Sequence, residues 1–226
     1  MDSNNRKAVT ILVDNDSWIL PYAERLVQEI QQLGRDAELV RTAEAIREGW
    51  VCFLLGCVKI VEQRYLKRNH HNLVVHESDL PKGRGFAPMA WQILQGANSI
   101  PVCLLEASAG EPDAGDIWLR DSIELEGQET LPLWRQLQGE KTIELCTGFV
   151  REYDSLLPVK QTGEPSWYKR RRPADSELDP DLSIREQFNL LRTVDNERYP
   201  AFIRVGDRKF FFSVGYENSS EKKNEN

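Results

Sequence analysis

The run Ala8-Val9-Thr10-Ile11-Leu12-Val13 decides the fold class, because an unbroken apolar and β-branched stretch of this length is typical of a strand buried on both faces. A polar cluster at 14–17 follows, which can turn the chain and cap a helix. From Trp18 to Leu33, apolar residues recur at intervals of three and four, the spacing of one helix face, and Gly34 ends the element. A strand followed by a helix in this way begins a parallel sheet with covering helices.

The alternation of strand and helix patterns continues along the chain. Further strands are predicted at 37–40, 51–57, 72–76, 102–106 and 116–125. Further helices are predicted at 43–48, 62–67, 91–95 and 131–153. Together these patterns predict an α/β fold with a Rossmann-like open, mostly parallel sheet and helices on both faces. Because neither GxGxxG nor GxxxxGK[ST] occurs, we expect neither NAD binding nor hydrolysis of a nucleoside triphosphate.

The composition changes after residue 153, where a proline-rich and basic segment begins. We expect a main domain at 1–153, then a subdomain at 154–216 with a linker, a short helix and a β-hairpin, and a disordered polar tail at 217–226. The helix is predicted at 183–194 and the hairpin at 201–214. The hairpin edge could support a homodimer, but a hairpin packed on its own domain would give the same sequence pattern.

The bulk composition narrows the function classes. The 226 residues carry a net charge of −7 and are 40% hydrophobic, as in soluble globular proteins. The acidic balance argues against nonspecific binding to nucleic acid or anionic membranes, since both need a basic surface. No targeting signal is visible and the four cysteines form no CxxC pair, so we expect a cytoplasmic protein with buried thiols. The three histidines lack zinc-ligand spacing, so no metal site is predicted.

One stretch combines chemistry-bearing residues with glycines and prolines: His76-Glu77-Ser78-Asp79-Leu80-Pro81-Lys82-Gly83-Arg84-Gly85-Phe86-Ala87-Pro88. His76 stands at the carboxyl end of a predicted strand, where open α/β sheets hold their ligands. Further on, Asp113 lies in a tight turn before Gly115, after another predicted strand. Alone, His76 fits an ordinary strand-end histidine and Asp113 an ordinary turn residue. Their occurrence together with the glycine loop favours a catalytic pair.

The pattern H-x-S-x-L-P-x-x-R-G-x-x-P, followed by a tryptophan-bearing helix and D-x-G-x-I, resembles the folate-dependent formyltransferase family. The resemblance covers roughly residues 50–150. It continues more weakly through 170–176 and 199–202, which are similar to the nucleotide-sugar N-formyltransferase branch of the pseudaminic-acid-pathway type. It implies transfer of a formyl group from 10-formyltetrahydrofolate to the amine of a UDP- or dTDP-linked 4-amino-4,6-dideoxyhexose.

The resemblance also implies roles for individual residues. His76 would stabilise the oxyanion that develops on the formyl oxygen and help to move the proton. Asp113 would orient His76, accept the proton lost by the amine and adjoin the folate. The backbone of Gly56, Cys57 and Val58 would pair with the pterin edge, although an ordinary strand end would have the same sequence.

For the acceptor, Asn15, Ser17 and Trp18 open the first predicted helix, whose amino end favours anions. Lys82 and Arg84 on the glycine loop could meet a diphosphate, or could belong to a solvated basic loop.

One position departs from the family pattern. The family usually has an asparagine two residues before the histidine as a second oxyanion donor, and Val74 stands there in this chain. Asn72 shares the strand face of His76 but lies roughly 13 Å along the strand, too far to act on the same oxygen.

Three alternatives stay open at this point. The acceptor could be initiator methionyl-tRNA, although those enzymes add a barrel-like carboxyl domain and this chain is acidic. It could be another amine. The chain could also be a folate- or nucleotide-binding module without catalytic activity, for which Val74 is the motivating feature.

Overall fold

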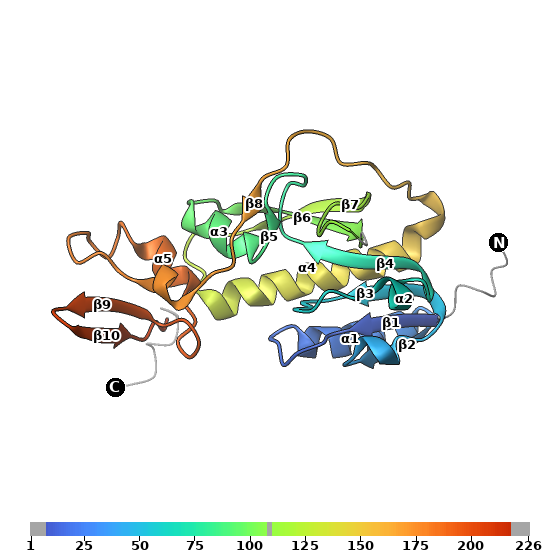
Figure 1. The fold of residues 1–226 in the computed structure, drawn as a ribbon, viewed down its shortest axis with the longest axis horizontal. Helices are drawn as coiled ribbons and strands as arrows, with labels where there is room; N and C mark the ends of the chain where they lie inside the picture. The colour runs from blue at the N-terminus through green and yellow to red at the C-terminus, as the bar shows by residue number, and fades with distance from the viewer. Residues whose placement is uncertain (1–7, 108–109, 218–226) are drawn as a thin grey trace, which may run out of the picture.

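The computed structural model describes residues 8–107 and 110–217. Of the predicted disordered tail at 217–226, all but the first residue therefore lies outside the described part. The centre of the molecule is a six-stranded sheet of order β2-β1-β3-β4-β6-β7 (Figure 1). Its strands are β1 (Ala8–Leu12), β2 (Asp36–Val40), β3 (Gly49–Leu54), β4 (Asn69–His76), β6 (Ser99–Glu106) and β7 (Ile117–Glu124).

The sheet is parallel in one half and antiparallel in the other. The strands β2, β1, β3 and β4 pair in parallel, whereas β6 runs antiparallel to both β4 and β7. His76, the last residue of β4, pairs with Cys103 of β6. The chain thus stays at the carboxyl edge of β4 after that strand ends, and β6 starts there and runs back. The predicted Rossmann-like, mostly parallel sheet is confirmed. The antiparallel strand β6 is the main difference from a fully parallel sheet.

Helices cover the sheet. They are α1 (Leu20–Gln32), α2 (Gln63–Leu66), α3 (Pro88–Leu94) and α4 (Leu131–Glu152), with α5 (Phe188–Thr193) in the carboxyl-terminal part. The long helix α4 runs lengthwise beside the sheet and packs against α1 (Figure 1). The contact is close at Gly139, where a Cβ atom would lie 2.5 Å from the Tyr22 ring. A larger residue there would force the Tyr22 ring to move.

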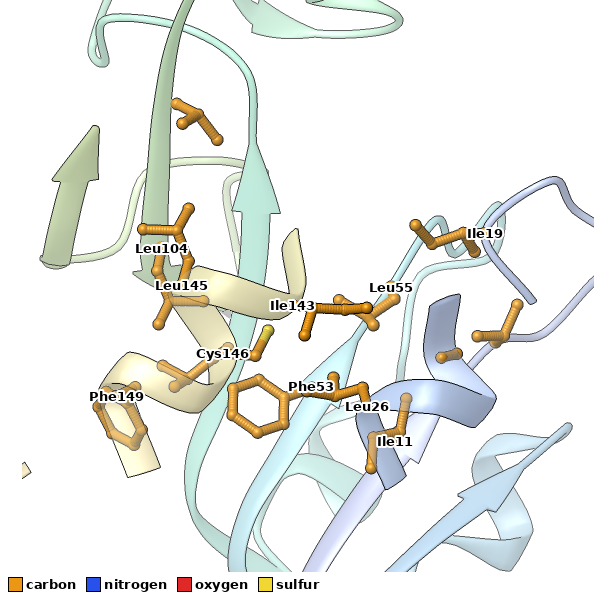
Figure 2. Close-up of a cluster of buried hydrophobic side chains, with 14 of the residues drawn as sticks. Ile11, Ile19, Leu26, Phe53, Leu55, Leu104, Ile143, Leu145, Cys146 and Phe149 are labelled. Atoms are coloured by element: carbon orange, nitrogen blue, oxygen red, sulfur yellow. The ribbon is translucent and has the colours of Figure 1, made fainter. Parts of the chain in front are cut away.

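The main core lies between the sheet and this pair of helices. Figure 2 shows Ile11 and Phe53 from the central strands meeting Leu26 of α1 and Ile143 and Phe149 of α4. All five side chains are buried. Burial of this apolar layer fixes α4 against the sheet, and α4 in turn reaches the carboxyl end of β4 where the candidate site lies.

The carboxyl-terminal part forms a strap and a hairpin. The strap, residues 156–169, passes β7, where Val159 bridges Ile117, and ends at β8 (Trp167–Tyr168), which pairs in parallel with β5 (Arg84–Gly85). The hairpin consists of β9 (Ala201–Val205) and β10 (Arg208–Phe212), as predicted. The predicted helix at 183–194 is helical only from Phe188. Residues 184–187 form turns at its start, where Ser183 and Glu186 make the reciprocal hydrogen bonds of a capping box.

The division into domains at residue 153 stays a prediction. Within the described residues, no helix is both long and apolar enough to cross a bilayer.

Candidate active site

His76 ends β4 and is 5% exposed. Its Nε2 lies 2.9 Å from the carbonyl oxygen of Gly83 on the glycine loop. Because a carbonyl only accepts, Nε2 carries the proton and donates it there. The other ring nitrogen, Nδ1, lies 3.6 Å from Oδ1 of Asp113. A proton on Nδ1 would therefore face a carboxylate.

Asp113 is held in place by its turn and by the glycine loop. Its backbone has a φ of 57°, a left-handed conformation that aspartate and asparagine adopt more readily than most residues. Its Oδ2 accepts the backbone N–H of Gly85 at 2.9 Å. Two positions on, a Cβ atom at Gly115 would lie 1.9 Å from the carbonyl oxygen of Glu106, so the turn requires glycine. The spacing D-x-G thus places the carboxylate beside His76.

Gln161 joins the strap to the Asp113 turn and to the glycine loop, and nothing in the sequence indicated it. Its Nε2 donates to the carbonyl oxygens of Asp113 at 2.7 Å and Gly115 at 2.9 Å. Its Oε1 accepts from Arg84 at 2.9 Å. A single glutamine in a proline-rich linker has no periodicity or motif that could have revealed this role.

The two basic residues of the glycine loop differ in their surroundings. Lys82 is exposed. Arg84 is 7% exposed, donates to Glu111 at 2.7 Å and lies 5.7 Å from the Trp167 ring centre. Lys82 is free to meet a ligand from the surface, whereas Arg84 would have to leave these partners to contact a diphosphate. Both remain predicted acceptor contacts.

Glu77 is a second residue that the sequence did not single out. It follows His76 in the chain and is 8% exposed. Its Oε1 accepts from Nε2 of Gln138 on α4 at 2.7 Å, and its backbone carbonyl accepts from Gln92 at 2.6 Å. Burial raises the pKa of its carboxyl above the usual range, against the opposing effects of the His76 charge and the Gln138 hydrogen bond.

The predicted folate and acceptor segments adjoin each other at the ends of β1 and β3. Asn15 donates from Nδ2 to the carbonyl oxygen of Gly56 at 2.8 Å. Asp14 accepts the backbone N–H of Val58 at 3.0 Å and that of Lys59 at 2.9 Å. Burial alone would raise the pKa of Asp14, but these hydrogen bonds and the one from Asn15 outweigh it, so that the pKa is lowered. An ionised Asp14 therefore fixes the loop.

The loop from Gly56 to Val58 combines a tight glycine turn with exposed apolar side chains beside it. Gly56 has a φ of 59°, and a Cβ atom there would approach Ile19 to 3.2 Å and the Ser17 hydroxyl to 3.6 Å. The side chains of Val58 and Ile60 beside it are 58% and 90% exposed. Exposed apolar surface next to a strand end with accessible backbone is suited to cover one face of a ring such as a pterin. The thiol of Cys57 lies 3.5 Å from the Leu12 carbonyl and points into the fold.

Trp18 lines a cleft of about 380 Å³ between the start of α4 and residues 194–198. The Arg135 guanidinium lies 5.7 Å from the Trp18 ring centre and 3.5 Å from a carboxylate oxygen of Asp195. Thr130, at the amino end of α4, also lines the cleft, and its buried Oγ1 has no hydrogen-bond partner in the part of the chain that the structure describes. The cleft therefore offers an aromatic face with polar groups around it.

Neither Val74 nor Asn72 supplies a second oxyanion donor. Val74 packs against the buried side chains of Leu80 and Leu105. The side-chain amide of Asn72 donates to the carbonyl oxygen of Leu66, at the other end of the strand from the loops. Among the described residues, no three histidine, cysteine or acidic side chains gather as metal ligands would.

The basic and aromatic residues of the weaker resemblance take part in local structure. Lys169 pairs with Asp175 at 3.0 Å, and the Arg170 guanidinium lies 4.5 Å from the Phe86 ring centre. Phe202 is 2% exposed and belongs to the interior. These contacts dock the strap and its continuation against the glycine loop.

Comparison with known proteins places this geometry in context. No protein-family model matches the chain. Over 113 residues, half of the chain, it is 30% identical to the methionyl-tRNA formyltransferase of Rickettsia massiliae. That stretch is 37% of the relative, so the chain matches little more than a third of that protein's length.

Solved structures match over nearly the whole chain. A methionyl-tRNA formyltransferase from Clostridium thermocellum has a TM-score of 0.76 at 21% identity, covering 95% of both chains. A sugar N-formyltransferase from Shewanella has a TM-score of 0.66 at 15% identity, covering 94% of this chain and 98% of its own. HypX from Aquifex aeolicus in complex with tetrahydrofolic acid has a TM-score of 0.74 at 17% identity, covering 89% of this chain and 36% of its own.

The class of protein that these comparisons define is an α/β protein with the formyltransferase fold. The resemblance to the formyltransferase family that the His76 and Asp113 motifs carry is thereby supported by fold and by sequence. Which acceptor a member of this class uses is a separate question, since the matched proteins bear the names of both tRNA and sugar formyltransferases.

Proposed function

We propose that the protein is a folate-dependent N-formyltransferase whose acceptor is a nucleotide-linked amino sugar. The observation that carries the proposal is the His76–Asp113 pair at the carboxyl end of β4, 3.6 Å apart beneath a glycine loop, in a chain with the formyltransferase fold. The four cysteines are free, which fits a cytoplasmic enzyme.

The pair is suited to attack of an amine on a formyl carbon. As the nitrogen adds, negative charge develops on the formyl oxygen, and a proton on the buried His76 ring can stabilise that charge. Asp113 keeps the ring oriented and accepts the proton that the attacking nitrogen loses. The proton then passes to the departing folate nitrogen when its bond to the formyl carbon breaks, which leaves an N-formyl product.

The formyl donor is proposed to be 10-formyltetrahydrofolate. The loop of Gly56, Cys57 and Val58 would hold its pterin, and Asp113 would adjoin the formyl-bearing end. Support comes from the exposed apolar side chains beside this loop and from the HypX complex with tetrahydrofolic acid, which shares the fold. When bound, the folate supplies the activated formyl group.

The acceptor is proposed to enter from the side of Asn15, Ser17 and Trp18, with a diphosphate reaching Lys82. The cleft beside Trp18 is large enough for part of a nucleotide, and an aromatic face with polar surroundings is typical of such sites. The net charge of −7 favours a small diphosphate over a long polyanion such as tRNA.

Initiator methionyl-tRNA is the second candidate acceptor. The sequence similarity to methionyl-tRNA formyltransferases favours it, although the matched stretch covers only 37% of the Rickettsia massiliae relative. A tRNA acceptor would need a larger basic surface than this acidic chain offers.

One experiment separates these candidates. The protein is incubated with 10-formyltetrahydrofolate and, in parallel, with a panel of UDP- and dTDP-linked 4-amino sugars or with methionyl-tRNA, and the products are followed by mass spectrometry. Gain of one formyl group on a sugar, and none on methionyl-tRNA, is the expected result. Formylation of methionyl-tRNA alone would replace the proposed acceptor. Binding of nucleotide sugars without any product would indicate a binding module.

A further inference from the structure

The hairpin at one end of the molecule leaves its second strand, β10, exposed (Figure 1). Strand β9 is covered at both edges. It pairs with β10 at one edge, and at the other its Phe202 carbonyl oxygen accepts the backbone N–H of Leu178 at 2.7 Å. Every residue of β10 is exposed, and in the described part of the chain its outer edge pairs with no other strand. An open edge of this kind presents backbone N–H and C=O groups to any strand that can align with it.

Apolar side chains gather on one face of the hairpin. Phe210 and Phe212 share that face of β10, because side chains alternate along a strand, and Val205 of β9 lies on it as well. Phe212 also lines a groove of about 480 Å³ between the hairpin and the segment before α5. Two aliphatic side chains of that segment, Leu182 and Ile184, line the same groove. These five residues form the hairpin face, and each is 42–63% exposed.

The hairpin face has the size of a protein–protein contact. Half-exposed side chains of this kind present roughly 100 Å² each, so the face offers about 500 Å² of apolar surface. That area is at the upper end of what monomeric proteins expose. Together with the backbone edge of β10, it approaches the ~800 Å² that each partner buries in a standard interface. The surface is therefore suited to a stable association.

The charges around the hairpin face complement one another. Arg208 and Lys209 lie on β10, and Asp179 lines the groove on the opposite side. None of these three side chains forms an ion pair with another residue of 8–107 or 110–217. Within one chain the two sides already attract each other, since Nε of Arg204 lies 2.9 Å from Oε1 of Glu177.

A second copy of the chain fits such a surface. In a two-fold symmetric contact the same patch meets itself, so the basic strand of each copy comes beside the acidic segment of the other. An anionic membrane would match only the basic side of the hairpin face. The complementary charges thus favour a second copy as the occupant.

We propose that two copies of the chain form a two-fold symmetric dimer through β10, with Phe210 of each copy opposite Phe210 of the partner subunit. Antiparallel pairing in this register places Arg208 opposite Phe212. It also places Lys209 opposite Phe211, so each cation of the strand meets an aromatic ring. A register centred on Lys209 would instead set two lysines against each other. The two hairpins together form one four-stranded sheet, and the pairing does not depend on which acceptor the enzyme uses.

The test measures the mass of the full chain in solution by analytical ultracentrifugation over a wide range of concentration. The wild type is expected at twice the mass of one chain. Phe210→Glu should raise the dissociation constant of the dimer at least about 100-fold, because the change occurs twice in a symmetric interface and brings two carboxylates together. Leu157→Glu is the matched control, since this leucine of the strap is 82% exposed, and it should remain dimeric.

A charge-swap experiment separates the proposed contact from misfolding. Phe210→Glu and Phe210→Lys should each be monomeric alone. An equimolar mixture of the two should form heterodimers, because opposite charges then meet at the two-fold axis, whereas misfolded variants would not recover.

Three results would overturn the proposal: a wild type that stays monomeric at every concentration, a Phe210→Glu protein as dimeric as the wild type, or no recovery in the mixture. A monomeric wild type that binds vesicles containing an anionic lipid, and loses that binding in Phe210→Glu, would assign the hairpin face to a membrane instead.

Discussion

Strand β4 carries two histidine–carboxylate pairs, and they differ in what holds the imidazole. Near the start of the strand, Nδ1 of His71 lies 2.6 Å from Glu106 and its Nε2 lies 2.8 Å from the Tyr153 hydroxyl. At the strand's end, Nδ1 of His76 lies 3.6 Å from Asp113 and its Nε2 donates to the backbone carbonyl of Gly83 at 2.9 Å. In the first pair, side chains contact both ring nitrogens at hydrogen-bond distance. In the second pair, the carboxylate is farther from the ring, and glycine-containing turns border the histidine.

The surroundings reinforce the contrast. The ring of His71 packs among those of Trp118, Phe149 and Tyr153, with centroids 5.1 to 5.6 Å away. Glu106 is also occupied, because it accepts from the indole of Trp118 at 3.0 Å. A histidine beside a carboxylate is therefore not sufficient evidence of catalysis. What distinguishes the two is that side chains hold both nitrogens of His71 at 2.6 and 2.8 Å, whereas the carboxylate beside His76 is 3.6 Å away and the ring lies at a strand end between two loops.

The largest expected effect is on catalysis at His76. His76→Ala should lower kcat/KM for formyl transfer by about 10²- to 10⁴-fold, because it removes both the oxyanion donor and the proton carrier. The rate is measured per folded molecule by steady-state kinetics. His71→Phe, compared in the same assay, should stay within a few-fold of wild type. If His71→Phe lowered kcat/KM more than His76→Ala did, the distinction between the two histidines would be wrong.

Asp113→Asn tests the carboxylate without altering the turn. Asparagine tolerates the left-handed backbone at this position and can still accept the N–H of Gly85, so the fold should be retained. Loss of the charge beside Nδ1 should lower kcat by about 10²-fold, with little change in the melting temperature. Full activity in this variant would show that the negative charge is not needed.

His71 should matter for stability rather than for rate. His71→Ala removes the hydrogen bonds to Glu106 and to the Tyr153 hydroxyl and leaves a cavity among the aromatic rings, so the free energy of unfolding should fall by about 2–4 kcal/mol. Denaturant unfolding measures the change. Unchanged stability, or activity lost beyond the unfolded fraction, would contradict a structural role.

The smallest of these effects concerns the strap. Gln161→Leu keeps the volume but removes the hydrogen bonds to Asp113, Gly115 and Arg84, so the Asp113 turn should become less well positioned. We expect kcat to fall by about tenfold with KM for folate unchanged. Gln161→Glu keeps only the acceptor for Arg84, and should resemble Gln161→Leu in rate if the bonds to the two carbonyls are the important ones.

The sequence predicted the sheet well because its strands are apolar runs and its helices show clear spacing. The motif around His76 likewise indicated the strand end at which the site lies. It did not predict the reversal at β6, since an apolar run such as 102–106 has no direction. Gln161 and Glu77 were missed because their roles arise from contacts with residues far away in the chain, such as Gln138, and no local pattern encodes such contacts.

The central claim is that the His76–Asp113 pair moves a formyl group from folate to a nucleotide-linked amine. The most direct measurement supplies 10-formyltetrahydrofolate with an isotopically labelled formyl carbon, together with the amino-sugar panel, to the wild type and to His76→Ala. The account predicts labelled N-formyl sugar with the wild type and almost none with the variant. Equal labelling by both proteins, or label retained on the folate in the wild type with every acceptor, would contradict it.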